Sequence, residues 1–168
     1  MARHRMLPHT ITLFNFVGED ENYKSSYMVT ILKNVHCVLH KGSVFSTIGT
    51  KPNDKADLYI FENYVIATDK DGNKKQYIPP DKWDECTHKE RYWTLHDDGT
   101  DIFVKGICSS NNIVDSFYNA IVTNNGDRLV WKHEDVNPAQ IENSICIKGV
   151  VHYDIGRPRM RHWEVYAG

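Results

Sequence analysis

The pattern of apolar and polar positions near the N-terminus predicts two antiparallel strands joined by a polar turn. Residues 10–17 are mostly β-branched or aromatic, and residues 18–22 are typical turn formers. In the second strand, over residues 27–39, one phase of a two-residue period holds five apolar side chains: Val29, Ile31, Val35, Cys37 and Leu39. Only Lys33 interrupts that phase. A strand of about thirteen residues is long, so we expect a bend or bulge near Lys33 and Asn34.

The middle of the chain continues with short strand-like segments. Residues 57–61 and 64–68 favour extended chain, and a turn over 69–73 leads to a returning strand at 75–78. Next, a proline-led segment over residues 79–86 favours a short helix that Trp83 anchors.

Two further hairpins complete the predicted sheet. Residues 91–95 and 101–105 predict one hairpin, and strands over 144–153 and 159–166 predict another. On the last strand four residues are expected to share one side: Arg159, Arg161, Trp163 and Val165. Between the hairpins, apolar residues at helical spacing favour a helix over 112–123, although part of that segment is also rich in strand formers. The pattern predicts a mainly β protein, a small antiparallel β-barrel or sandwich with one or two short helices.

Composition fits one domain. The chain has 168 residues, of which 40% are hydrophobic and 25% charged, which is enough for a single core. A formal charge of -2 gives no global attraction to nucleic acid or membrane. No stretch approaches the roughly 20 apolar residues that cross a bilayer, and residues 1–8 lack the apolar centre of a signal peptide. We therefore expect assembly in the cytoplasm.

The residues that could carry metal or catalytic chemistry are sparse. His36 and His40 would lie about 13 Å apart on a strand with Cys37 on the opposite face, too far for one zinc ion without a bend. The four cysteines form no CxxC pair and are expected to be free thiols. No nucleophile elbow or phosphate-binding loop is present, and the acidic turn at 97–101 is expected to be solvated. We expect no cofactor, no metal and no catalytic residue.

Three segments stand apart from the sheet. Residues 1–9 read as a basic N-terminal arm. Residues 41–56 form a long loop whose apolar Val44, Phe45 and Ile48 would pack either on the body of the fold or on another subunit. Near the C-terminus, Arg157, Arg159 and Arg161 could contact DNA phosphates or a partner, or simply form a polar strand face.

Several phrases in this order resemble a known group of proteins. They are LPHTITLFNF from residue 7, YMVTILKNV from 27, GTKPND from 49 leading to LYIF from 58, YIPP from 77, YWTL from 92 and HWEV from 162. Together they resemble head-closure, or stopper, components of the head-to-tail connector of tailed phages and prophages of Gram-positive bacteria. The resemblance covers residues 7–105 and 145–166, and residues 106–143 look like an insertion.

The resemblance implies a virion structural protein of the phage neck. Such proteins are small β-barrels that form a ring between the portal-adaptor complex and the tail, with a loop that reaches the axis and helps retain packaged DNA. By position, the 41–56 loop is the channel loop here: Phe45 and Ile48 would contact neighbouring subunits, while Lys51 and Lys55 would face DNA or an adjacent ring. The expected location is the virion neck, and the expected partners are further copies of the chain, the portal-adaptor complex and a tail-completion or tail-tube protein.

Two alternatives remain at the level of sequence. One is a tail-completion or tail-terminator protein of the same virion. The other is a small β-barrel binding module or enzyme. A ring-forming protein is expected to show higher oligomers when purified, whereas a monomeric enzyme is not.

Overall fold

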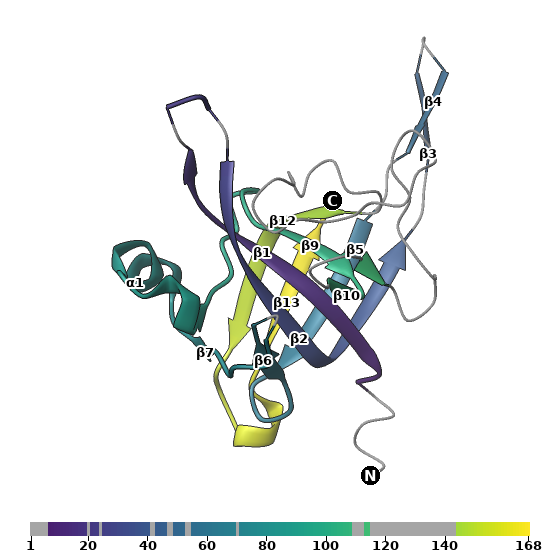
Figure 1. The fold of residues 1–168 in the computed structure, drawn as a ribbon. Helices are drawn as coiled ribbons and strands as arrows, with labels where there is room; N and C mark the ends of the chain where they lie inside the picture. The colour runs from purple at the N-terminus through teal and green to yellow at the C-terminus, as the bar shows by residue number, and fades with distance from the viewer. Residues whose placement is uncertain are drawn as a thin grey trace.

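A computed structural model describes residues 7–19, 21–23, 25–40, 43–46, 49–52, 55–69, 71–108, 113–114 and 144–168. The protein is mainly β, as predicted. Six strands join edge to edge: β1 (His9–Glu19), β9 (Ile102–Lys105), β12 (Ile145–Tyr153), β13 (His162–Ala167), β5 (Lys55–Phe61) and β2 (Ser25–His40). Because β2 also pairs with β1, the antiparallel sheet closes on itself as a barrel (Figure 1). A short strand, β6 (Ile66–Thr68), pairs with β2 beside β5.

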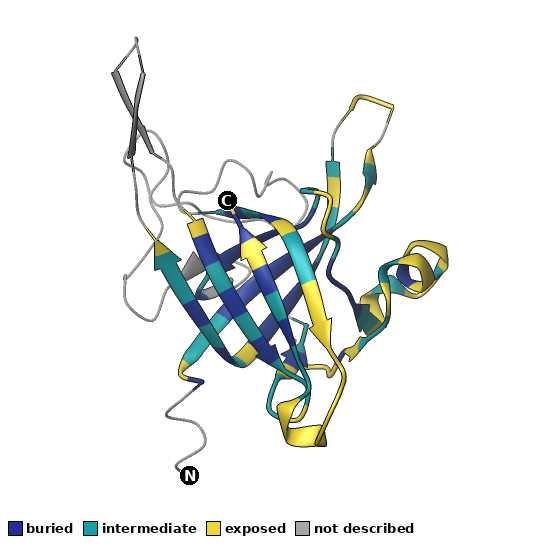
Figure 2. Cartoon of the chain, turned by 180° about the vertical axis from the view of Figure 1, so that it is seen from behind, coloured by how far each residue is buried: buried dark blue, intermediate teal, exposed yellow. Residues whose placement is uncertain are grey.

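The barrel is filled by the alternate side chains that its strands turn inward. Strand β5 shows the alternation cleanly, with Ala56, Leu58 and Ile60 buried and the residues between them partly exposed (Figure 2). The core cluster draws on every strand of the ring and includes Ile11, Leu13, Phe103, Ile147 and Val165. In this core, side chains from strands that are far apart in the chain pack against one another.

The bulge predicted in the second strand lies at Asn34. His9 pairs with Val35 and Thr10 with Lys33, so Asn34 has no partner on β1, and its backbone is left-handed with φ of 60°. The extra residue exchanges the two faces of the strand, because Leu32 and Val35 both point into the core. The prediction of one continuous apolar phase along this strand was therefore wrong, although the predicted position of the bend is confirmed.

The strand at 92–93 has a different partner from the one predicted. The two-residue strands β7 (Gln76–Tyr77) and β8 (Tyr92–Trp93) pair in parallel. Strand β9 lies instead between β1 and β12, so the predicted hairpin of 91–95 with 101–105 is wrong. Between β7 and β8 lie the predicted helix, α1 (Pro80–Glu85), whose buried Trp83 pins it to the body, and a 3-10 turn, η2 (Lys89–Arg91).

The two ends of the described chain correct three boundaries. Leu7 is buried and His9 opens β1, so the predicted arm of residues 1–9 joins the barrel at its last three residues; residues 1–6 lie outside the described part. Strand β13 begins only at His162, after a 3-10 turn, η4 (Pro158–Met160). The predicted strand over 159–166 therefore starts three residues too early, and Arg159 shares no strand face with the buried Trp163.

The predicted helix over 112–123 is wrong at its start. Residues Ile113–Val114 form β11, which pairs antiparallel with β10 (Ile107–Cys108). Residues 115–143, the remainder of the expected insertion, lie outside the described residues.

Candidate functional site

A β-hairpin occupies the segment that was expected to be a long loop. Strands β3 (Ser43–Ser46) and β4 (Gly49–Pro52) pair antiparallel, and the hairpin projects away from the barrel between β2 and β5 (Figure 1). Phe45 on β3 is opposite Thr50, and Lys51 on β4 is opposite Val44. A projecting two-stranded element has little stability of its own and gains order by pairing with something else.

The four loop residues named from the sequence do not all lie in this hairpin. Phe45 and Lys51 are on its two strands, whereas Ile48 lies outside the described residues. Lys55 is the exposed first residue of β5, opposite His40 on β2, at the root of the hairpin. The structure therefore separates Lys55 from the projecting part.

The three arginines lie in and around the turn between β12 and β13. Arg157 precedes η4, Arg159 is inside it, and Arg161 follows it. Arg157 and Arg159 are exposed, whereas Arg161 is half-buried and its Nε finds no hydrogen-bond partner among the described residues. The first two arginines are therefore accessible to a partner from solution, whereas the third precedes β13 and its carbonyl accepts a hydrogen bond from the Glu62 N–H.

A half-open cavity of about 500 Å³ lies at the mouth of the barrel on the side of that turn. Its lining comes from segments far apart in the chain: Glu62, Val65, Ala67, Lys75, Gln76, Tyr77, Trp93, His152 and Trp163. The indole of Trp163 packs against Tyr77 with ring centroids 4.5 Å apart and stacks on His152 at 4.7 Å. Tyr77, Trp93 and Trp163 come from three of the phrases that carry the resemblance, and the fold brings these phrases together.

Lys75 places a buried ammonium group beside this cavity. Its Nζ donates hydrogen bonds to the Val29 carbonyl, 3.0 Å away, and to the Thr30 hydroxyl, 2.6 Å away. Burial lowers the pKa of Lys75 to about 8, against the smaller opposing effects of Asp69 and Glu90. Both of these bonds go to β2, so the amine ties the 69–77 segment to the barrel.

A carboxylate–imidazole pair stands at the rim of the same cavity. The Glu62 carboxylate is paired with the His152 imidazole, which in turn lies flat on Trp163. Both partners are partly exposed, so the pair is accessible from solvent. Cavities of this kind at barrel mouths are common places for small ligands, and the aromatic floor here gives the cavity a rigid base.

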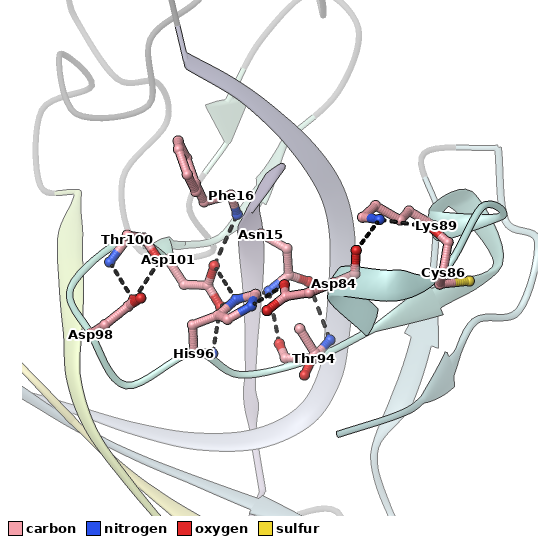
Figure 3. A network of polar contacts seen from close by, with 10 residues as sticks. All are labelled: Asn15, Phe16, Asp84, Cys86, Lys89, Thr94, His96, Asp98, Thr100 and Asp101. Atoms are coloured by element: carbon pink, nitrogen blue, oxygen red, sulfur yellow. Dashed lines mark hydrogen bonds and ion pairs between the residues drawn. The ribbon is translucent and has the colours of Figure 1, made fainter. Parts of the chain in front are cut away.

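A second polar network joins β1, the 94–101 segment and α1 (Figure 3). Its centre is Asp101, whose side chain is fully buried and accepts hydrogen bonds from the backbone N–H groups of Phe16 and His96 and from the Asn15 amide. Asn15 also exchanges two hydrogen bonds with the backbone of Thr94. The expectation that the acidic turn is solvated was wrong for Asp101.

His96 connects this centre to the helix. Its Nδ1 lies 3.0 Å from Asp101 and its Nε2 lies 2.9 Å from Asp84 on α1. Burial lowers the pKa of His96, but hydrogen bonds and charges from Asp101 and Asp84 outweigh that effect and raise the pKa to about 9. An imidazolium that is bonded at both nitrogens holds elements together and has no free lone pair to act as a base.

The histidines considered for zinc are dispersed. Cys37 points into the core, His36 stacks on His9 with centroids 5.5 Å apart, and His40 pairs with Asp57. Across the described residues, no group of three or more His, Cys, Asp or Glu side chains could hold a metal ion. Cys86 and Cys146 are free thiols. None of the helices in the described part of the chain could span a lipid bilayer.

Sequence reasoning missed the cavity and the buried network, because neither has a local signature. Lys75 follows a run of polar turn residues, and Asp101 is one of three aspartates in five positions, so burial alone sets them apart.

Comparison with curated proteins and with solved structures finds no match. A model of one protein family does match, over residues 6–168, which is nearly the whole chain. The protein therefore belongs to DUF6751, a family of unknown function.

Proposed function

We propose that this protein is a virion structural protein of the phage neck: a ring-forming head-closure component that seals the head after DNA packaging and joins the portal-adaptor complex to the tail. The observation that carries the proposal is the closed barrel with a hairpin projecting between β2 and β5. This is the position at which the resemblance expects a channel loop. A rigid barrel suits a ring wall, and a projecting hairpin suits a contact with the channel.

The hairpin carries the working residues of this proposal. In a ring, copies of the hairpin converge, so that Phe45 and Ile48 contact neighbouring subunits and Lys51 faces packaged DNA or an adjacent ring. Lys55, at the exposed root of the hairpin, contacts the neighbouring barrel or ring. The barrel itself has both edges of every ring strand paired, which leaves the hairpin as an element that a partner can complete.

The same geometry serves a tail-completion protein, which would meet the tail tube in place of the adaptor. The two roles are separated by where the protein sits in the neck, and a cryo-EM map of the neck with this chain placed in it distinguishes them.

The cavity at the barrel mouth supports a second candidate, a small β-barrel binding module. Its support is the rigid aromatic floor of Tyr77, Trp93 and Trp163 with the Glu62–His152 pair at the rim. We rank it second because Trp93 and Trp163 are almost completely buried, which leaves a ligand little aromatic surface to cover.

Deletion of residues 43–54, with a short glycine linker between β2 and β5, tests the first proposal. We expect the barrel to stay folded, with an unchanged circular dichroism spectrum, because all of the core residues that the structure describes lie outside the deleted segment. Particles assembled with the deletion should package DNA and then lose it, measured as free DNA after assembly and as a fall in infectivity. A matched control replaces the same residues by a glycine-serine segment of equal length.

Fully infectious, DNA-retaining particles with the deletion would contradict the closure function. Particles that retain DNA but lack tails would point to tail completion.

A further inference from the structure

The tip of the β1–β2 hairpin is acidic and carries exposed apolar side chains. Val17 and Tyr23 are exposed, and Tyr23 is 85% exposed with a left-handed backbone at φ of 59°, a conformation that non-glycine residues rarely adopt. Glu19 and Glu21 are also exposed. Over residues 17–25 the sequence holds three acids and one lysine, which leaves a formal charge of -2. A large aromatic side chain held outward in this way is unusual for a solvated turn.

The tip of the β12–β13 hairpin has the opposite charge and the same apolar character. Ile155 is 88% exposed and Met160 is 64% exposed, and both flank the exposed Arg157 and Arg159. Over residues 154–161 the sequence holds three arginines and one aspartate, which leaves a formal charge of +2. The 3-10 turn and a glycine with φ of 96°, Gly156, give this tip a defined shape.

The two tips lie at opposite ends of the barrel. In Figure 1 the β1–β2 tip is at the upper end and the β12–β13 tip at the lower end, and Figure 2 shows both tips as exposed. Two different surfaces that complement each other on one molecule make a head-to-tail contact between copies, and such a contact closes into a ring when the rotation between copies allows it.

We infer that the β12–β13 tip of one copy docks on the β1–β2 tip of the next copy, and that this contact is a subunit interface. The inference rests on the proposed function, because it supplies the contact that a ring requires. The partner that each tip binds is a second copy of this chain. The formal charges of the two tips are equal and opposite, and both tips carry exposed apolar side chains.

The chemistry of the contact divides into a centre and a rim. Tyr23 and Ile155 would bury each other at the centre and so be removed from water. They are the two most exposed large apolar residues in the described part of the chain. Arg157 and Arg159 would face Glu19 and Glu21 around them, which steers the encounter and fixes its direction. Because such rim pairs are screened by ions, assembly should weaken as salt is raised.

Two charge-reversed variants test this contact. In R157E/R159E both tips of the molecule are acidic, and in E19K/E21K both are basic. Each variant alone is expected to lose assembly, with at least a tenfold rise in the protein concentration needed for half-assembly, measured by sedimentation velocity at low salt. An equimolar mixture is expected to assemble again, because acidic tips of one variant then meet basic tips of the other.

The matched control is K82E/K148E, which changes the charge by the same amount as R157E/R159E at two exposed lysines outside both tips, one on α1 and one on β12. It should assemble like wild type, and circular dichroism should show every variant folded.

The possible results separate this contact from the ring itself. Rings that survive both tip reversals would overturn the contact while leaving the ring proposal in place. Open chains that respond to the reversals and to mixing would support the contact and overturn the ring. Wild-type protein that stays monomeric at every concentration would overturn both.

Discussion

The Nδ1 of His96 lies 3.0 Å from a carboxylate oxygen of Asp101, and the Asp101 side chain is fully buried. This pair links the barrel to α1 in addition to the Trp83 anchor, because His96 reaches Asp84 on the helix with its other ring nitrogen. A buried carboxylate is stable only when its hydrogen bonds are satisfied, and Asp101 accepts them from three residues: Asn15 and Phe16 on β1, and His96.

Replacing Asp101 by Asn should destabilise the protein strongly. In D101N, one nitrogen of the His96 imidazolium faces a neutral amide. The new NH2 group is itself a donor, so it meets N–H groups whose hydrogen bonds the carboxylate had accepted. We expect a loss of about 3–5 kcal/mol in the free energy of unfolding, measured by urea denaturation at pH 7. The control is D97N, a neighbouring exposed carboxylate, which should change stability by less than about 0.5 kcal/mol. Equal effects of the two changes would contradict a central role for Asp101.

The stability contributed by His96 should depend on pH. Its pKa is raised to about 9 in the folded protein, above the ordinary value of 6.5, so the folded state holds this proton more tightly. The contribution is fully present below pH 6.5 and is lost as pH rises through 9, with a magnitude on the order of 2–3 kcal/mol. Unfolding measured from pH 6 to 9.5 should show this fall in wild type and lack it in H96Q.

Lys75 should produce a pH dependence of opposite sign. Burial lowers its pKa to about 8 from 10.5, so the unfolded chain binds this proton more tightly than the folded protein does. Stability from this group is therefore lost as pH falls through 8 and fully present above 10.5, on the order of 2–3 kcal/mol. Over pH 8–10.5, K75M should lack this rise, whereas K74M, at the exposed neighbouring lysine, should keep it. An identical pH profile in both variants would show that the Lys75 amine is solvated.

The bulge at Asn34 should accept glycine and reject a branched side chain. The backbone φ at Asn34 is 60°, which glycine adopts without steric strain. The Asn34 side-chain amide also donates a hydrogen bond to the Tyr64 carbonyl at 3.2 Å. We expect N34G to change the free energy of unfolding by less than about 1 kcal/mol and N34V to lower it by about 1–3 kcal/mol. Thermal denaturation of the two variants side by side measures the difference. If N34V proved as stable as N34G, the left-handed conformation would be incorrect.

Trp83 should hold α1 against the barrel. The side chain is fully buried, its ring centroid is 5.4 Å from that of His96, and the Lys89 ammonium lies over its face at 5.1 Å. A six-residue helix is not stable alone, so its position depends on this anchor. We expect W83A to cost about 3–5 kcal/mol and to expose the 80–91 segment to proteolysis. W83F should recover part of the stability and most of the protease resistance.

Sequence patterns predicted most strands but not all of their partners. β-branched and aromatic residues identified β1, period-two alternation identified β2, and the length of β2 led to its bulge. The sequence pattern could not show that the bulge exchanges faces between Leu32 and Val35, because the exchange depends on Asn34 having no partner on β1. It also paired 91–95 with 101–105, because adjacent strands usually form hairpins, whereas Asp101 instead turns the chain inward to bring β9 beside β1.

The candidate sites were less predictable than the fold. The 41–56 segment was identified by its length and apolar content, but its hairpin was not. The cavity combines Lys75, Trp93 and Trp163, which are separated by many residues and meet only through closure of the barrel. The complementary tips were partly visible as charge, in the arginines of 157–161, but their exposed apolar side chains depend on the turn geometry.

Closure of the barrel has a consequence for how copies of the protein can associate. Each of the six ring strands already has a hydrogen-bonded neighbour on both sides, so the subunit completes its own sheet without borrowing a strand from elsewhere. Further copies therefore find no free edge on these six strands to which a strand could be added. Any association must use side chains or the short strands outside the ring, such as β3 and β4.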